Sequence, residues 1–340
     1  MHAATYVGAK TLTVIEREPE LPGSGEAQIE VAYTGICGTD LHILHGDMDA
    51  RVTMPAVLGH EMSGTIVAIG EGVEDWSPGD LVTVMPLVWD GTCPACRAGN
   101  NHICHNLDFL GIDSPGSMQA SWTVPQDVLV ALPPGLSLER GALAEPTAVA
   151  VHDVRRAALR EGEKALVVGG GPIGLLIACA ARAVGGDVLV LEVSEARRAF
   201  AETIGLRAVD PIAGDLQALL AEWTADAGAD VAFEVSGAAA GIETAIQSLA
   251  VRGRMVVVAI HSSPKPVNLF RVFWRELTLI GARVYERPDF EEAVRLLASG
   301  AIPAEQMITR VDPLGDVAAA FAELESGRAM KVLIDCQSSD

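Results

Sequence analysis

Residues 167–174 read VVGGGPIG, a glycine-rich turn that leaves an apolar, β-branched run and opens a helical pattern. Its glycines follow the spacing G-x-G-x-x-G. The first glycine of such a turn permits the tight bend, the second lets the backbone approach a pyrophosphate, and the third lets the helix pack on the strand. The helix N-terminus then faces the phosphates. The residues expected to bind a dinucleotide here are Gly169, Gly171, Pro172, Ile173 and Gly174.

A carboxylate ends the next predicted strand. Glu192 follows the turn by about 20 residues, where its side chain can accept hydrogen bonds from both hydroxyls of a ribose. A negative charge at this place repels the additional phosphate of NADP, whereas Arg197 and Arg198 could partly offset the repulsion. We therefore predict NAD as the cofactor, preferred over NADP but not to its exclusion.

Apolar strands and amphipathic helices alternate around this turn. The predicted strands are 164–168, 187–191, 230–235 and 254–260, and the predicted helices start at Pro172, at Ser194 and after residue 235, the last two ending at Gly205 and Gly253. Strands that alternate with helices of this length form a parallel, doubly wound α/β sheet. We expect the strand at 254–260 to close the set.

Residues 1 to about 130 differ, because short β-branched runs at 28–33, 63–69 and 81–85 lie between turns rich in Gly and Pro. This pattern indicates a compact, partly barrel-like β domain. Two helical patterns and a strand at 331–334 come late in the chain and are expected to return to this domain. A chain of 340 residues with 49% hydrophobic content is long enough for two cores.

The charge balance disfavours several partners. The chain has 24 Lys and Arg against 45 Asp and Glu, a formal net charge of -21, so its field repels nucleic acid and anionic membranes. We find no signal-peptide pattern and no apolar run of about 20 residues, and we expect a soluble cytoplasmic protein. Six cysteines, three of them between 93 and 104, are more typical of metal ligands than of disulfides.

One short loop carries four potential metal ligands. They are Asp90, Cys93, Cys96 and Cys104. Closely packed thiolates need a dication to offset their mutual repulsion, and a closed tetrahedral zinc site is the usual solution. We therefore predict a structural zinc. Asp90 is the expected fourth ligand, with His102 or His105 as the alternative.

A second group of potential metal ligands comes from two stretches, Cys37-Gly38-Thr39-Asp40-Leu41-His42 and Gly59-His60-Glu61. Cys37 and His60 offer a thiolate and an imidazole that can converge on a metal. A catalytic zinc needs three protein ligands and one open position, so either Glu61 or Glu145 supplies the carboxylate.

The remaining polar residues of this stretch have separate expected roles. Asp40 is placed to orient a ligand imidazole from behind. Thr39 and His42 offer a hydroxyl and a second imidazole beside the metal, which predicts a path for a proton next to a Lewis acid.

Taken together, these motifs resemble the zinc-dependent medium-chain dehydrogenases over essentially the whole chain. The matching stretches are 37–42, 59–64, the loop 90–104, Glu145-Pro146 and 169–174, all in the family's order and spacing. The resemblance implies a GroES-like zinc-binding catalytic domain at 1–146 and 283–340 and a Rossmann NAD-binding domain at 147–282.

Glu145 occupies the position at which classical alcohol dehydrogenases have a cysteine. A glutamate at this position resembles the polyol branch of the family, which contains sorbitol, butanediol and threonine dehydrogenases. In that branch the carboxylate beside the metal histidine, here Glu61, often coordinates, while the later glutamate lies close by. Ile43 replaces a substrate-side tyrosine of sorbitol dehydrogenases, so sorbitol is not assigned as the substrate.

The resemblance implies hydride transfer between NAD and a secondary alcohol, polyol or vicinal diol. A zinc-bound alkoxide would form, and its proton would leave through Thr39, a cofactor ribose hydroxyl and His42. Thr147, Ser236 and Arg283 would lie near the cofactor. As alternatives, Ser236 caps the next helix and Arg283 sits in a subunit contact.

Other interpretations remain open at this point. Within the family they are a threonine dehydrogenase-like enzyme and a simple alcohol dehydrogenase. A zinc-free quinone reductase would lack the Cys37 and His60 pair, and a non-catalytic nucleotide-binding protein could retain the fold.

The substrate pocket is expected around Ile43, Trp89, Phe109 and Arg283, and the acidic surface disfavours anionic substrates. The apolar sheet edge at 277–284 predicts a homotetramer, with a dimer as the alternative.

Overall fold

The computed structural model describes residues 1–338 and divides into two compact units. Unit 1 comprises Met1–Glu145, Glu286–Gly300 and the chain from Ala304 onward, and unit 2 comprises Pro146–Tyr285 with Ala301–Pro303. The chain therefore leaves the first unit, builds the second and returns.

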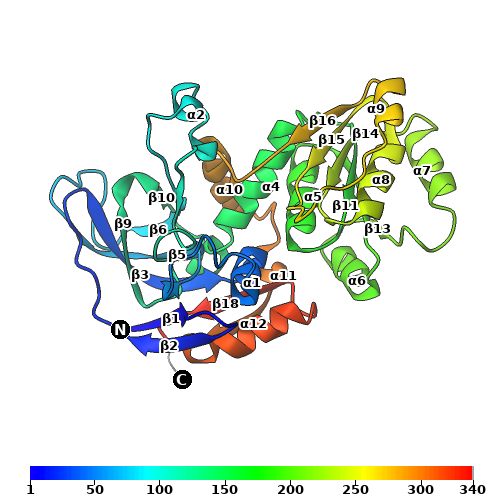
Figure 1. Cartoon of the computed structure of the whole chain (residues 1–340). Coiled ribbons are helices and arrows are strands. Elements are labelled where there is room, and N and C mark those ends of the chain that lie inside the picture. Colours follow the sequence, from blue (N-terminus) through cyan, green and yellow to red (C-terminus); the bar gives the residue numbers. More distant parts are fainter. Residues whose placement is uncertain (339–340) are drawn as a thin grey trace. The chain divides into compact units, whose positions relative to one another are not determined.

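Unit 1 is β-rich, as predicted, and its main sheet has β3 (Glu26–Gly35) at its centre (Figure 1). The strand order is β10-β6-β5-β3-β18-β17, and β9 also pairs with β3. The other strands of this sheet are β5 (Glu61–Ile69), β6 (Leu81–Val84), β9 (Ser121–Pro125), β10 (Leu129–Ala131), β17 (Ile308–Pro313) and β18 (Lys331–Asp335). A small sheet has the order β2-β1-β4, from Leu12–Glu16, His2–Tyr6 and Ala56–Val57.

The late strand β18 lies directly against β3. The two strands are antiparallel, with Leu333 opposite Gly35, and β17 pairs with β18 on its other side. The end of β3 is therefore close in space to residues nearly 300 positions later in the chain.

The helices of unit 1 are α1 (Gly38–His45), α2 (Pro94–Arg97), α3 (Leu138–Gly141), α10 (Arg287–Ser299), α11 (Ala304–Met307) and α12 (Val317–Glu325).

Unit 2 is the predicted doubly wound sheet, with all its strand pairs parallel in the order β13-β12-β11-β14-β15-β16. The strands are β11 (Lys164–Val168), β12 (Asp187–Leu191), β13 (Ala208–Val209), β14 (Ala229–Glu234), β15 (Leu249–Val257) and β16 (Thr278–Gly281). The helices are α4 (Ala144–Arg156), α5 (Pro172–Ala183), α6 (Glu195–Thr203), α7 (Leu216–Thr224), α8 (Ala239–Ser248) and α9 (Leu269–Trp274). The strand order reverses between β11 and β14, where such sheets bind ligands.

Two predicted boundaries in unit 2 are wrong. The helix after β14 ends at Ser248 instead of Gly253, and β15 begins at Leu249. Arg252 takes a φ of 62° beside Gly253, so this pair bends a strand and does not terminate a helix. In addition, the sheet closes with β16 rather than with the strand predicted at 254–260, since β16 pairs with β15 along its length.

Candidate metal and cofactor sites

Pairing of β3 with β5 assembles the first candidate site. Cys37 follows β3 as the N-cap of α1, and Glu61 opens β5 opposite Gly35 with His60 just before it. One ligand atom from each of Cys37, His60 and Glu61 lies within 4.8 Å of the other two. The strand register thus brings together two segments that are separate in the sequence.

Asp40 is placed behind this group. Its side chain is fully buried, accepts a hydrogen bond from the Cys37 N–H at 2.8 Å and lies with Oδ1 3.8 Å from His60 Nδ1. The ring of Phe109 packs edge-on against the imidazole at 5.3 Å between centroids. Asp40 thus faces one nitrogen of the His60 ring, although neither of the two facing atoms has a hydrogen-bond partner among the described residues.

A buried lysine that was not predicted, Lys331, also belongs to this site. This lysine opens β18, is 5% exposed and places Nζ against Glu61 Oε2 while donating to the Ile36 carbonyl at 3.2 Å. Burial disfavours its charged form, but the charges of Glu61, Cys37 and Glu145 raise its pKa above the ordinary value. A lone lysine within the apolar run 330–334 is the signal that could have identified it.

The surroundings of His60 are strongly anionic. Burial opposes its protonation, but Asp40, a hydrogen bond to Cys37, and the charges of Cys37 and Glu145 hold its pKa well above the usual range. Glu145 is 4% exposed and lies outside the three-residue ligand group, although its charge acts on His60 and Lys331. A half-buried thiol beside a buried imidazole and a buried carboxylate, in a field that favours positive charge, fits a zinc ion.

The second cluster lies on the loop that carries α2. Asp90, Cys93, Cys96 and Cys104 each place a ligand atom within 4.8 Å of the others. The Cys93 sulfur lies 3.5 Å from that of Cys96 and 3.8 Å from that of Cys104, close to the roughly 3.8 Å that tetrahedral zinc–sulfur geometry requires. The side chains of His102 and His105 are outside this group among the described residues.

Hydrogen bonds prepare the carboxylate and one thiol of this loop for a metal. The N–H of Cys93, the amide of Asn106 and the N–H of Thr92 donate to Asp90 and lower its pKa. Backbone N–H groups of Cys96 and His105 lower the pKa of Cys93 to about 7, whereas burial raises that of Cys96 to about 12. The donor set fits a closed zinc site in which Asp90 replaces a fourth cysteine.

The glycine turn of unit 2 has the geometry of a dinucleotide site. Gly169 takes a φ of 113°, which an L side chain rarely adopts, and Gly171 is the N-cap of α5. A Cβ at Gly174 would collide with the Gly169 carbonyl, so only glycine fits there. Pro172 and Ile173 form the first turn of α5.

Glu192 lies at the end of β12, 6% exposed, beside the same turn. Its two oxygens accept hydrogen bonds from the N–H groups of Gly170 at 2.8 Å and Ser194 at 2.7 Å. Arg197 approaches it at 4.0 Å, whereas Arg198 donates to the carbonyls of Glu192 and Val193. Arg198 is therefore engaged by the protein, and Arg197 is the cation nearer the Glu192 carboxylate.

The other residues predicted near the cofactor have mixed surroundings. Ser236 donates to Glu234 at 2.6 Å and accepts from the Ala238 N–H at 3.2 Å, while α8 has Ala238 as its N-cap. The hydroxyl of Thr147 is buried with no hydrogen-bond partner among the described residues, as a ligand-binding hydroxyl would be. Arg283 is exposed and engages other described residues.

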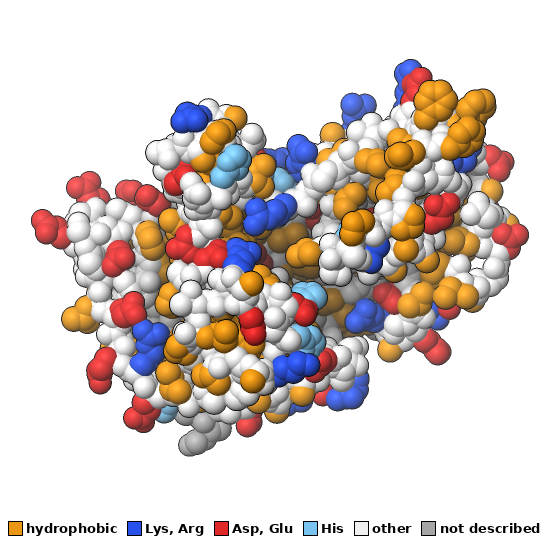
Figure 2. All heavy atoms as spheres, in the orientation of Figure 1, with side chains coloured by type: hydrophobic (Ala, Val, Ile, Leu, Met, Phe, Trp, Pro, Cys, Tyr) orange, Lys and Arg blue, Asp and Glu red, His pale blue; other side chains and the backbone are white. Residues whose placement is uncertain are grey.

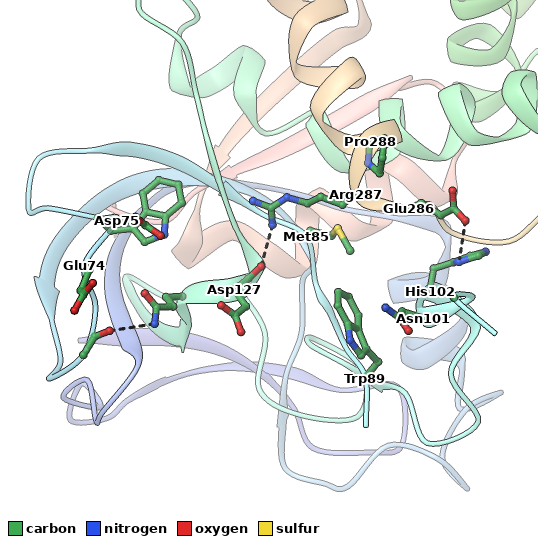
Figure 3. Close-up of a pocket in the computed structure, with 14 residues that line it drawn as sticks. Glu74, Asp75, Met85, Trp89, Asn101, His102, Asp127, Glu286, Arg287 and Pro288 are labelled. Atoms are coloured by element: carbon green, nitrogen blue, oxygen red, sulfur yellow. Dashed lines mark hydrogen bonds and ion pairs between the residues drawn. The ribbon is translucent and has the colours of Figure 1, made fainter. Parts of the chain in front are cut away.

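A cavity of about 780 Å³ in unit 1 lies apart from the residues described above (Figure 3). Trp89, Asn101 and His102 line it on one side and Asp127 and Arg287 on another. Of the residues predicted to line the substrate pocket, Trp89 borders this cavity, but none of the Cys37 group does. We therefore do not assign it to the substrate.

Comparison with known proteins covers both units. Residues 23–134 match the family model "Alcohol dehydrogenase GroES-like domain" and residues 172–299 match "Zinc-binding dehydrogenase". The 2-dehydro-3-deoxy-L-galactonate 5-dehydrogenase of Pseudoalteromonas atlantica is 50% identical over 99% of both chains.

Solved structures of dehydrogenases also superpose on nearly the whole chain. The 2R,3R-butanediol dehydrogenase of Bacillus subtilis superposes with a TM-score of 0.90 at 33% identity, covering 98% of this chain and 99% of that one. The short chain alcohol dehydrogenase of E. coli CFT073, complexed with NADH, superposes with a TM-score of 0.91 at 28% identity over 98% and 99%. Among residues 1–338, no helix is long and apolar enough to cross a bilayer.

Proposed function

Because the chain belongs to the zinc-dependent medium-chain dehydrogenase family, we propose that Cys37, His60 and Glu61 hold its catalytic zinc for the oxidation of a secondary hydroxyl by NAD. The observation that carries the proposal is the convergence of these three ligand atoms in a buried, anionic site. Zinc supplies the Lewis acidity that lowers the pKa of a substrate hydroxyl, and NAD accepts the hydride.

The chain's own residues orient the reactants and move the proton. Asp40 holds the His60 ring, and Lys331 holds Glu61 while Glu145 adds negative charge from outside the group. Thr39 and His42 would carry the proton of the substrate hydroxyl toward water, because His42 is exposed to solvent. Unit 1 carries this chemistry and the structural zinc of the Asp90 loop, and unit 2 carries the nucleotide through Gly169–Gly174 and Glu192.

The substrate class follows from the most similar sequence named above. That relative acts at position 5 of a deoxy sugar acid, so we infer a polyhydroxy carboxylate oxidised at an inner secondary hydroxyl. The expectation from surface charge that anionic substrates are disfavoured is secondary, since local contacts decide binding once the substrate has arrived.

An assay with a defined panel tests this inference. Turnover would be followed by NADH absorbance with 2-dehydro-3-deoxy-L-galactonate, L-galactonate, sorbitol, 2,3-butanediol and L-threonine. We expect the highest kcat/KM for one of the two sugar acids. A higher value for sorbitol or butanediol would place the enzyme among the neutral polyol dehydrogenases, and no turnover with loaded zinc would favour a non-catalytic nucleotide-binding protein.

We also propose a homo-oligomer that works in the cytoplasm. Helix α9 exposes three large aromatic side chains, Phe270, Phe273 and Trp274, each at least 69% exposed. Phe270 stacks on Trp274, and the helix is one of the apolar areas visible in Figure 2. Strand β16 leaves one edge of the sheet unpaired beside them. An apolar face next to an open sheet edge favours association of two copies, and two such pairs give the tetramer. All six cysteines are free thiols, which suits a reducing compartment.

A further inference from the structure

Helix α1 ends in a Schellman motif that contains one of the relay residues. Gly46 takes a φ of 85°, its N–H donates to the Ile43 carbonyl at 2.9 Å, and the N–H of Asp47 donates to the His42 carbonyl at 3.0 Å. This pair of hydrogen bonds brings the side chain after the glycine back against the last turn of the helix, commonly as an apolar contact. In this chain the two side chains that meet are Asp47 and His42.

The contact between these side chains is polar and directional. Asp47 Oδ2 lies 3.1 Å from His42 Nδ1. An ionised carboxylate can only accept a hydrogen bond, so this partner favours the imidazole that carries its hydrogen on Nδ1 and leaves Nε2 with a lone pair. Thr39 precedes His42 by one helical turn, which places its hydroxyl on the same face of α1 as the imidazole.

The turn that presents Asp47 is anchored in the core. Tyr6 of β1 is fully buried, and its hydroxyl donates to Asp49 Oδ1 at 2.9 Å. Asp47 is therefore held between a helix end and an anchored residue two positions later. The backbone of this turn therefore fixes the point from which the Asp47 side chain extends, next to the last turn of α1.

We propose that Asp47 is a positioning residue of the proton relay, because it holds His42 in the tautomer whose Nε2 accepts the substrate proton. The inference rests on the relay role of His42 proposed above. In the oxidation direction the substrate's hydride would pass to NAD and its hydroxyl proton, by way of Thr39, to Nε2, and the imidazolium would then release a proton to water. Release is direct because the side chains of His42 and Asp47 are 58% and 61% exposed. An aspartate orients the general-base histidine of serine proteases by the same logic.

The test compares Asp47→Asn with Glu325→Gln. The control is matched, since Glu325 Oε1 lies 2.7 Å from Nε2 of His45, an exposed histidine on the same helix outside the relay. Asp47→Asn should lower kcat about three- to ten-fold with the KM for NAD unchanged, a part of the full effect of a general base. Glu325→Gln should leave both constants unchanged. In a His42→Gln background, Asp47→Asn should have no further effect.

Nitrogen-15 NMR of the imidazole rings tests the tautomer without turnover. The wild-type His42 should carry its hydrogen on Nδ1, and Asp47→Asn should shift it toward Nε2, whereas Glu325→Gln should leave His42 unchanged. An unchanged tautomer, an equal loss of kcat in the control, or a loss that persists without His42 would overturn the role of Asp47. A wild-type kcat for His42→Gln would instead show that the relay in the proposed function is wrong, and the role of Asp47 with it.

Discussion

The ammonium group of Lys331 is in contact with the carboxylate of Glu61, and both side chains are almost fully buried beside Cys37 and His60. The pair joins the first residue of β18 to the first residue of β5. A buried charge whose partner is removed is strongly destabilising, whereas a metal ion can replace the missing partner. Lys331 and zinc thus act on the same carboxylate.

Replacing Lys331 by Met should show whether Lys331 and zinc both neutralise the Glu61 carboxylate. Without metal, the free energy of unfolding should fall by about 3–5 kcal/mol, because Glu61 is left as an unpaired buried charge. Added zinc should raise the melting temperature more in Lys331→Met than in the wild type. Lys164→Met is the control, since its surface pair with Asp187 should contribute no more than about 1 kcal/mol. Equal losses in both variants in the presence of a chelator would contradict this prediction.

Zinc binding to the Asp90 loop should release protons in a pH-dependent number. The Cys96 thiol, with a pKa of about 12, is protonated throughout the neutral range, while the Cys93 thiol titrates at about 7. Both must be deprotonated to coordinate zinc. The pair should therefore release about two protons per zinc near pH 6 and about one near pH 8, as its titration requires.

Calorimetry in buffers of different ionisation enthalpy measures this release, in a Cys37→Ser variant that leaves the loop site intact. A proton count that does not change across this range would show that Cys93 does not titrate near neutral pH. Cys96→Ser should remove about one released proton at both pH values and leave the difference between them, because that difference belongs to Cys93.

Glu192→Gln should change the choice of cofactor. The substitution keeps the size of the side chain and removes its charge, so kcat/KM for NAD should fall about 10- to 100-fold, the usual cost of losing charged hydrogen bonds. The ratio of NADP to NAD activity should rise, because Arg197 remains close by. Glu195→Gln removes the same charge from an exposed position three residues later and should leave the ratio unchanged. If both variants shift the ratio equally, Glu192 has no specific role.

Charge on the exposed face of α9 should dissociate the oligomer. Phe273→Glu buries a carboxylate in any interface formed there, and light scattering should then report a smaller assembly than for the wild type. Ile212→Glu is the control, because Ile212 is 80% exposed on a different segment of unit 2. An unchanged mass for Phe273→Glu would remove α9 from the proposed interface.

Local sequence rules identified the parts of the site that lie on contiguous motifs. The cluster from Asp90 to Cys104 and the glycines at 169, 171 and 174 could be found from spacing alone, because one short loop or one turn contains them. Cys37 and His60 were also predicted as a pair from their residue types, but the choice between Glu61 and Glu145 stayed open, since only the register of β3 and β5 brings Glu61 beside them.

Lys331 and Asp47 were not found, for two different physical reasons. Lys331 meets Glu61 through the pairing of β18 with β3, which joins residues about 270 positions apart. Local secondary-structure propensity does not reveal which distant strands pair or in what register. Asp47 follows a glycine that ends a helix, and its orientation appears only when the Schellman hydrogen bonds are present. The wrong end of α8 has a similar origin, because the sequence does not show whether a glycine ends a helix or bends a strand.

The place of β18 in the sheet has a consequence for synthesis of the protein. The strand that supplies Lys331 lies between β3 and β17, yet it is translated some 300 codons after β3. While the ribosome is still making unit 2, the edge of β3 at Tyr33–Gly35 is open and Lys331 is not yet present beside Glu61. A nascent chain can therefore acquire zinc at Cys37 and His60 before Lys331 arrives, and the order of metal loading and strand insertion decides which cation Glu61 meets first.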